Sequence, residues 1–263
     1  GLFDDIDVNS NKLGATVAKR NANLVKLIEG VADMKLGNYK EHSIDAFGDA
    51  YEYLMGMYAS NAGKSGGEFF TPQEVSELLT RIAVVGKTEV NKVYDPACGS
   101  GSLLLKAAKI LGKENVRQGF YGQEINLTTY NLCRINMFLH NIEFDKFNIV
   151  REDTLLSPMH WDDQPFELIV SNPPYIPTCE LDDLQEEVKK EPSTALDGGE
   201  DGLIFYRHIV KEWGKKLKEG GLMAFEADPC EMEDIKMLLL NEGFGNIGII
   251  NDLGDLQRVI YGY

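Results

Sequence analysis

The sequence predicts a doubly wound α/β fold, with a seven-stranded, mostly parallel sheet that ends in an antiparallel edge hairpin and with an N-terminal helical segment before it. Short apolar runs typical of strands alternate with segments of helical periodicity from residue 93 onward. A glycine-rich turn separates the first of these strands from the first helix. Only a few residues around Leu253 and Gly254 join the last two strand-like runs, which is too short for a crossover and predicts a hairpin.

The N-terminal part carries apolar residues at helical spacing over 11–37 and again over 42–59. We therefore expect residues 1–65 to form a helical segment. The stretch 61–70 is rich in Gly and Ser and predicts a loop. Thr71 and Pro72 then have the residue types that cap and begin a helix, which we place at 72–84.

The remaining residues, 66–263, form one predicted α/β domain. Its expected strands are 93–95, 119–124, 147–152, 166–171, 222–227, 246–252 and 257–263. Its expected helices are 102–111, 126–141, 203–218 and 231–242. The stretch 178–201 is acidic and irregular, and we expect it to run over the surface.

Composition excludes several classes of function. The 263 residues are 43% hydrophobic and 26% charged, as in soluble globular proteins, and no apolar run approaches the ~20 residues of a membrane helix. The chain begins with an acidic stretch that lacks the apolar core of a signal peptide. The four cysteines form no CxxC pair and the four histidines are separated, so we expect no metal site, no disulfide and a cytoplasmic location.

The net charge argues against tight binding of nucleic acid by this chain alone. The formal charge is −16, and residues 166–263 hold 9 Lys and Arg against 20 Asp and Glu, which leaves −11 on that part. Proteins that bind DNA unaided usually present a basic surface. Any role on DNA would therefore need a basic partner or a local basic patch.

The first candidate site is the turn after strand 93–95. Asp95 ends the strand, and Gly99 and Gly101 allow a sharp bend and a close approach to a ligand before the helix begins at Ser102. Glu124 stands at the carboxyl end of the next strand, where a carboxylate accepts hydrogen bonds from ribose hydroxyls. The third glycine of GxGxxG is missing, so S-adenosylmethionine fits better than a dinucleotide.

Two further groups follow the third and fourth strands at the same sheet edge. Asp153, followed by Thr154, is placed to accept from the exocyclic amine of adenine. Asn172 emerges beside the cofactor within the segment SNPPYIP. Its side-chain carbonyl and the backbone carbonyl of Pro173 can both accept from one NH2 group, and the prolines hold that pair rigidly.

Such an arrangement suits methyl transfer to a nitrogen. The lone pair of an amide or aromatic amine is delocalised, and two accepted hydrogen bonds increase its electron density for in-line attack on a sulfonium methyl. Tyr175 is expected to stack on the planar group that carries the amine. No strong base is required, because the proton can leave after transfer. The predicted catalytic motif is Asn172, Pro173, Pro174 and Tyr175.

The larger part of the chain resembles the modification subunit of type I restriction systems, which are DNA adenine-N6 methyltransferases. The resemblance rests on GGEFFTPQEV (66–75), YDPACGSGSLLL (94–105), GQEIN (122–126), TYNLCRINMFLH (129–140), EDTL (152–155) and SNPPY (171–175), and covers about 1–175. It implies a class I S-adenosylmethionine-dependent, Rossmann-like methyltransferase fold that binds S-adenosylmethionine or S-adenosylhomocysteine. The implied cofactor contacts are Glu68, Phe69, Phe70, Thr71, Pro72, Gln73, Asp95, Pro96, Ala97, Gly99, Ser100, Gly101, Ser102, Glu124, Ile125, Asp153, Thr154 and Asn172.

The C-terminal part resembles a second family, the glutamine-N5 methyltransferases of peptide-chain release factors. The segments are SNPPYIP, EPSTALDGGEDGLIFYRHIV (191–210), LKEGGLMAFE (217–226) and LLNEGFGNIGIINDLGDLQRVIYGY (239–263), and cover about 166–263. FEADPCE (225–231) departs from that family, which usually has a glycine-containing turn there. We interpret the chain as a hybrid of a cofactor half, 66–165, and a second-family half, 166–263, and the sequence leaves an engineered and a natural origin equally open.

Three functions remain open at this point. The first is adenine-N6 methylation, with DNA reached only through a specificity subunit. The second is glutamine methylation of a release-factor protein, favoured by 191–210. The third is a scaffold that binds S-adenosylmethionine without efficient catalysis.

Overall fold

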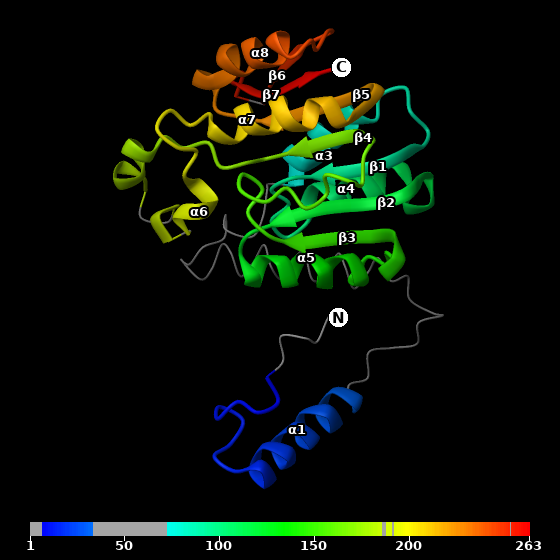
Figure 1. The fold of residues 1–263 in the computed structure, drawn as a ribbon, viewed down its shortest axis with the longest axis vertical. Coiled ribbons are helices and arrows are strands. Elements are labelled where there is room, and N and C mark those ends of the chain that lie inside the picture. Colours follow the sequence, from blue (N-terminus) through cyan, green and yellow to red (C-terminus); the bar gives the residue numbers. More distant parts are fainter. Residues whose placement is uncertain (1–6, 34–72, 186–187, 191, 253) are drawn as a thin grey trace. The chain divides into compact units, whose positions relative to one another are not determined.

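The computed structural model describes residues 7–33, 73–185, 188–190, 192–252 and 254–263 (Figure 1). Residues 7–33 belong to one compact unit and the described residues from 73 onward to another. No helix among the described residues is both long and apolar enough to cross a membrane. The expected helix 42–59 and the expected loop 61–70 lie outside the described residues.

The N-terminal unit contains one described helix, α1 (Val17–Ala32). It begins later than the expected 11–37 because Thr16 caps it: the Thr16 hydroxyl accepts from the N–H of Lys19 at 3.3 Å. The residues before it turn back on themselves, and Asn23 donates its side-chain amide to the carbonyl of Leu13 at 2.6 Å. The helical spacing of apolar residues thus begins before the helix does, within the turn that caps its N-terminus.

The second unit is built on one sheet of seven strands, in the order β3-β2-β1-β4-β5-β7-β6 (Figure 1). The strands are β1 (Val90–Asp95), β2 (Val116–Glu124), β3 (Phe147–Arg151), β4 (Phe166–Ser171), β5 (Leu217–Glu226), β6 (Gly248–Asn251) and β7 (Gln257–Gly262). β1 to β5 run parallel to one another, whereas β7 is antiparallel to both β5 and β6. The predicted mostly parallel sheet with an antiparallel edge hairpin is confirmed.

Helices cover both faces of the sheet and bury two cores (Figure 1). The helices of the second unit are α3 (Gln73–Ala83), α4 (Ser102–Leu111), α5 (Leu127–Leu139), α6 (Ser193–Leu196), α7 (Ile204–His208) and α8 (Met232–Asn241). Side chains of α3, α4 and α5 pack on one face, and those of α7 and α8 pack on the other with Trp213 and Phe225. Both cores are apolar, so the sheet is held between two layers as in other doubly wound folds.

The segment 203–226 differs most from the expectation. One helix was predicted over 203–218, but α7 ends at His208 and continues as a π-turn (Ile209–Trp213) and a 3-10 turn (Gly214–Lys216). β5 begins at Leu217 rather than at 222 because Leu217 already pairs with Phe166. The pairing then skips to Leu168 opposite Leu222, so four residues with a left-handed Gly220 bulge out of the ladder.

The stretch 178–201 contains short helical turns instead of being wholly irregular. They are η4 (Thr178–Asp183), η5 (Val188–Lys190) and α6. After them the chain returns to the segment that follows β4. The N–H of Ile176 donates to the carbonyl of Leu196 at 2.9 Å, and the N–H of Gly198 donates to the carbonyl of Ile176 at 2.8 Å. The excursion is therefore tied to the residues that directly follow NPPY.

The strand order reverses between β1 and β4. β2 and β3 extend to one side of this pair, and β5 extends to the other. In open α/β sheets, ligands bind outside the carboxyl ends of the strands at such a point. The glycine turn after β1 and NPPY after β4 both lie there.

Candidate active site

Asp95 ends β1 and fastens the glycine turn to the neighbouring strand. Its Oδ1 accepts from the hydroxyl of Ser171 at 2.8 Å and from the N–H of Ala97 at 3.0 Å. The residue is only 1% exposed, and this burial raises the pKa of its carboxyl to about 7 although both hydrogen bonds lower it. Asp95 therefore couples the ends of β1 and β4.

The two glycines of the turn have different surroundings. Gly101, at φ 89°, touches α5 so closely that a Cβ there would stand 2.8 Å from the sulfur of Cys133. Gly99, at φ 52°, has no atom within 4 Å of the place where its Cβ would be. Only glycine adopts such left-handed backbone without cost. Gly101 thus brings α4 against α5, and Gly99 leaves open space at the mouth of the turn.

Glu124 holds the glycine turn from the end of β2. Its Oε2 accepts from the N–H of Gly99 at 3.1 Å and its Oε1 accepts from the N–H of Asn126 at 2.7 Å. Burial raises the pKa of Glu124, and the hydrogen bonds from Asn126, Gly99 and Ile125 oppose the shift. Asn126 also caps α5, since its side chain accepts from the backbone of the first helical turn.

Asp153 and Thr154 follow β3 and face the same edge. Both hydrogen bonds to Asp153 use Oδ1, which accepts from the N–H of Leu155 at 2.8 Å and of Leu156 at 3.3 Å. The buried hydroxyl of Thr154 donates to the carbonyl of Pro96. Thr154 thus joins the end of β3 to the turn after β1.

The NPPY motif lies where β4 ends. Pro173 is buried, and Asn172 and Tyr175 are half-buried. Burial is the main cause that raises the pKa of the Tyr175 hydroxyl to about 12, and the nearby Glu226 adds to it. The backbone of Tyr175 is tightly covered, because a Cβ on Gly198 would stand 2.7 Å from its Cα.

These segments surround one cavity of about 620 Å³. Of the predicted site residues it is lined by Pro96, Ala97, Gly99, Ser100, Ser102, Glu124, Ile125, Asp153, Thr154, Asn172, Pro173, Pro174 and Tyr175. Asp95 and Gly101 do not line it. Gln73 begins α3, whereas Glu68, Phe69, Phe70, Thr71 and Pro72 lie outside the described residues.

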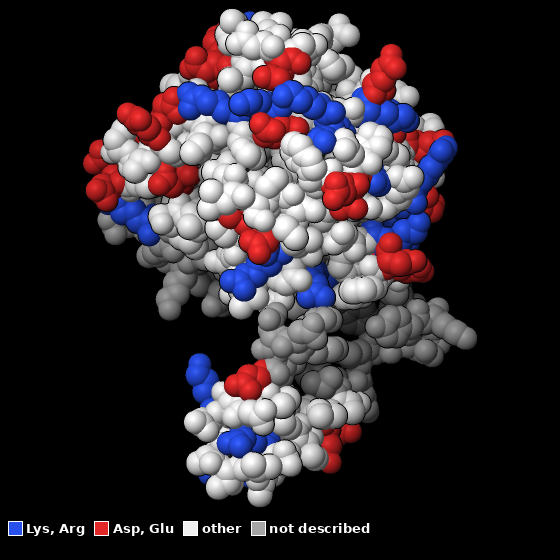
Figure 2. Space-filling view, viewed as in Figure 1, with Lys and Arg blue, Asp and Glu red and all other residues white. Residues whose placement is uncertain are grey.

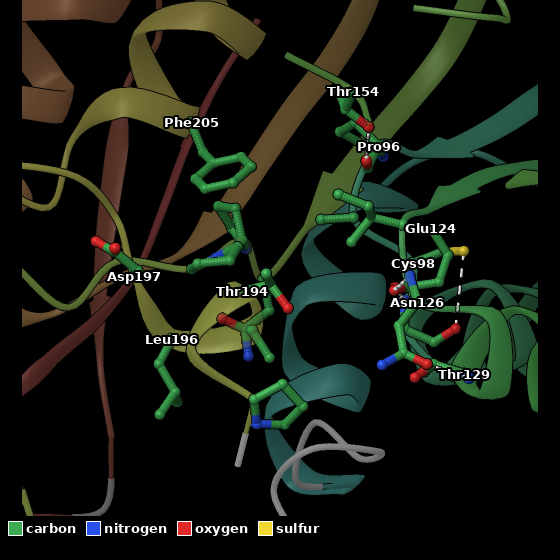
Figure 3. Close-up of a pocket in the computed structure, with 18 of the residues that line it drawn as sticks. Pro96, Cys98, Glu124, Asn126, Thr129, Thr154, Thr194, Leu196, Asp197 and Phe205 are labelled. Carbon is green, nitrogen blue, oxygen red and sulfur yellow. Dashed lines mark hydrogen bonds between the residues drawn. The ribbon is translucent and has the colours of Figure 1, made fainter. Parts of the chain in front are cut away.

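The cavity has two walls, which Figure 3 shows facing one another. Pro96, Cys98, Glu124, Asn126, Thr129 and Thr154 form the first wall, and Thr194, Leu196, Asp197 and Phe205 the second. The first wall comes from the ends of β1, β2 and β3 and from the first turn of α5. The second comes from α6, α7 and the loop between them.

Several lining residues were not identified from the sequence. They are Cys98, Gln123, Asn126, Thr129, Glu152, Leu155, Ile176, Val188, Pro192, Ser193, Thr194, Ala195, Leu196, Asp197, Gly199, Ile204, Phe205 and Glu226. For most of them the sequence gives no signal, because their place depends on how 178–201 folds back. Glu226 is one exception, since it lies near the carboxyl end of the predicted strand 222–227, and others, such as Cys98 and Asn126, stand within the motifs quoted above. Among the described residues, no three His, Cys, Asp or Glu side chains are grouped as a metal ion would need.

Comparison with known proteins places this site in a family. The model of the N-6 DNA Methylase family matches residues 42–228. The chain is 48% identical over 229 residues to a type I restriction enzyme methylase subunit from Mycoplasma pneumoniae, which covers 82% of this chain and 42% of the relative. It is 37% identical over 193 residues to a release factor glutamine methyltransferase from Clostridium acetobutylicum, which covers 72% of this chain and 65% of the relative.

A solved structure of a related subunit also aligns with this chain. The methyltransferase subunit of a type I restriction-modification system from Streptococcus thermophilus aligns with a TM-score of 0.66 at 30% identity. The alignment covers 100% of this chain and 57% of that one. This chain thus spans less than two thirds of each of these three relatives.

Both predicted resemblances are confirmed, but each extends further than expected. The family match continues to residue 228, beyond 175, and the release-factor relative covers 72% of the chain, far more than 166–263. Both therefore cross the expected junction and lend no support to a hybrid origin. The seven-stranded fold and the family match together show that this chain belongs to the N-6 DNA Methylase family of class I S-adenosylmethionine-dependent methyltransferases.

Proposed function

We propose that this chain catalyses methyl transfer from S-adenosylmethionine to N6 of adenine in DNA, as the catalytic part of a modification subunit. The observation that carries the proposal is the single cavity shared by the glycine turn, Glu124, Asp153 and NPPY. The 48% identity to a type I methylase subunit supports the choice of acceptor.

The first wall of the cavity fits the cofactor. The volume of about 620 Å³ lies within the range of small-molecule sites, and Gly99 leaves room where any side chain would intrude. Glu124 would accept from the ribose hydroxyls while its hydrogen bonds to the turn fix its position. Asp153 binds its own loop through Oδ1 only, which leaves Oδ2 for the adenine amine. The bound cofactor would supply an electrophilic methyl group on a positively charged sulfur.

The acceptor amine would lie between the two walls at NPPY. Asn172 and the carbonyl of Pro173 would each accept one of its hydrogens, and the double proline limits the motion of both acceptors. Tyr175 stays a neutral phenol at physiological pH, because its pKa is raised to about 12. It is therefore suited to stacking on the acceptor and unsuited to removing a proton.

A second candidate acceptor is the glutamine side chain of a release-factor protein. The second wall, which lies within 191–210, favours it, and so does the 37% identity to a release factor glutamine methyltransferase. Excess negative charge in 166–263 also opposes a DNA backbone more than a protein loop. A scaffold that binds the cofactor without efficient catalysis is the third candidate.

If the acceptor is adenine in DNA, this chain requires a partner protein to contact the DNA. The type I relative is more than twice the length matched here, and its name describes one subunit of a larger enzyme. We propose that a specificity subunit supplies the basic surface that this acidic chain lacks.

Calorimetry with S-adenosylmethionine, followed by transfer of a radiolabelled methyl group, tests the proposal. We expect binding that Glu124→Ala weakens on the order of 100-fold, because two charge-assisted hydrogen bonds are lost. Glu143→Ala, at an exposed position that does not line the cavity, is the matched control and should bind normally.

The acceptor is decided by offering duplex DNA with a specificity subunit in one reaction and a release factor in another. Label in DNA that depends on Asn172 supports adenine methylation. Label in the release factor alone would show that the acceptor is glutamine and not adenine. Cofactor binding without label in either acceptor supports the scaffold and overturns both catalytic readings.

A further inference from the structure

Glu226 ends β5 and lines the cavity beside NPPY, yet the proposed function gives it no role. The residue is only 6% exposed, and its Oε2 has no hydrogen-bond partner among the described residues. A buried carboxylate oxygen without a partner is costly, so such groups usually mark a place that a ligand completes.

The strand register brings Glu226 next to the catalytic motif. Ser171 of β4 pairs in parallel with Phe225 of β5, so the following residues, Asn172 and Glu226, leave neighbouring strands side by side. Neighbouring strands lie about 4.8 Å apart. The backbone of Glu226 is fixed on its other side, because it pairs with Val259 of β7 and its carbonyl accepts from the Tyr206 hydroxyl at 2.7 Å.

Methylation of an NH2 group requires that a proton leave the nitrogen. Five other acidic or phenolic side chains line the cavity, namely Glu124, Glu152, Asp153, Tyr175 and Asp197. Tyr175 is a neutral phenol. Glu124 and Asp153 already have a role in the proposed function, which is to bind the cofactor. Glu152 is exposed and Asp197 is half-buried, so Glu226 is the only buried carboxyl among the described residues that line the cavity.

We propose that Glu226 is the catalytic residue that accepts this proton. The inference rests on the proposed methyl transfer and holds for either acceptor, because both present an NH2 group. The nitrogen lone pair forms the new N–C bond, and the C–S bond breaks with its electron pair remaining on sulfur. The N–H proton passes to Oε2 of Glu226 and then to solvent through the open cavity.

The surroundings of Glu226 suit a base that works near neutral pH. Burial raises the pKa of its carboxyl to about 7, and the positive charge of Arg258 on β7 opposes the shift. The other titratable groups that interact with this cluster are Tyr175 after β4, Tyr206 of α7, and Asp228 and Glu231 after β5. At pH 8 the carboxyl is mostly ionised and ready to accept.

Glu226→Gln tests the inference, because it keeps the shape of the side chain and removes its basicity. We expect kcat to fall about 10²- to 10⁴-fold, with the affinity for S-adenosylmethionine unchanged by calorimetry. The acidic limb of the kcat–pH profile, with its midpoint near 7 in the wild type, should disappear. Glu226→Asp should retain the limb at reduced kcat.

Glu231→Gln is the matched control. Glu231 is also buried and its pKa is also raised to about 7, but it does not line the cavity. This variant should keep both kcat and the acidic limb. The same loss in both variants would assign the effect to general electrostatics and overturn the inference.

A readout that needs no turnover is the titration of the carboxyl carbon in a chain with 13Cδ-labelled glutamate, where Glu226→Gln identifies the signal. A midpoint near 7 supports the inference, and a midpoint at the usual glutamate value of about 4.3 overturns it. Methyl transfer that persists in Glu226→Gln refutes the role of Glu226 alone. A wild type that labels neither DNA nor release factor refutes the proposed function, and the inference falls with it.

Discussion

Asp95 supports the glycine turn without lining the cavity. Its place at the end of the strand before that turn predicts a cofactor contact. In the structure its carboxyl accepts from the hydroxyl of Ser171 on β4 and from the N–H of Ala97 in the turn. The position in the sequence thus indicates that the residue belongs to the site, whereas its role within the site depends on the packing.

The raised pKa of Asp95 makes stability depend on pH. In the unfolded chain this carboxyl loses its proton near pH 3.9, but in the folded chain it holds it to about 7. Its contribution is therefore full below about pH 3.9 and is lost as the pH rises through about 7. The free energy of unfolding should fall by up to about 1.4 kcal/mol per pH unit between these values.

Asp95→Asn should flatten this dependence, because the amide keeps an acceptor for Ser171 and Ala97 but does not ionise. Urea unfolding between pH 4.5 and 8 measures the slope. Part of the slope should remain, since the pKa values of Glu226 and Glu231 are also raised to about 7. Asp145→Asn, at an exposed position, should leave the slope unchanged, and an unchanged slope in Asp95→Asn would contradict the assignment.

Among the elements, those with strong local signals were predicted and those fixed by distant contacts were not. α4 and β4 begin and end where the sequence places them, because glycine or proline bounds each one. The helix predicted over 203–218 failed at its end, where Trp213 packs into the core and Leu217 pairs with Phe166. Tertiary pairing there overrides helical periodicity, and a local pattern contains no information about it.

The loop after α6 is a second element that the sequence did not resolve. Gly198 lies so close to NPPY that an added Cβ would meet the carbonyl of Gly202 at 2.6 Å and the Cα of Tyr175 at 2.7 Å. Both contacts are with backbone, which cannot move aside cheaply. This close approach packs the second wall of the cavity against NPPY.

Gly198→Ala should therefore destabilise the protein by about 1–3 kcal/mol through overpacking, measured as a lower urea midpoint. Gly245→Ala is the matched control, because a Cβ there meets nothing within 4 Å and neither glycine has left-handed backbone. We expect the control to stay within about 0.5 kcal/mol of the wild type. Equal stability of the two variants would show that the loop does not pack against Tyr175 as described.

In the second unit as a whole, the order of the strands brings the residues of the site together. The strand order reverses between β1 and β4, and parallel strands end at a common edge, so residues far apart in sequence meet there. Part of the first wall could be predicted, because Pro96, Glu124 and Thr154 each stand at or just after the end of a recognisable strand. The opposite wall could not, because residues 192–205 reach the cavity only through the excursion that returns to Ile176.

Charge is also a property of the whole chain, and it limits what the chain does alone. Figure 2 shows a row of basic side chains across one face, and the exposed cations of the segment that includes α7 are Arg207, Lys211, Lys215 and Lys218. Two of them are already paired, Arg207 with Asp201 and Lys218 with Glu167. This row therefore offers few free positive charges to DNA phosphates, and the formal charge of the whole chain is −16.

We expect the isolated chain to bind duplex DNA with a Kd weaker than about 100 µM near 150 mM salt, because few phosphate charges would be neutralised. Anisotropy of a labelled duplex across a salt series measures this. The slope of log K against log salt should correspond to about two released counterions, one for each of Lys211 and Lys215. Their joint replacement by Glu should remove it, whereas Lys113→Glu, at an exposed site on η2 (Lys113–Asn115), should not. Micromolar binding by the isolated chain would contradict the need for a basic partner, because a chain that already holds DNA has no use for a second subunit to deliver it.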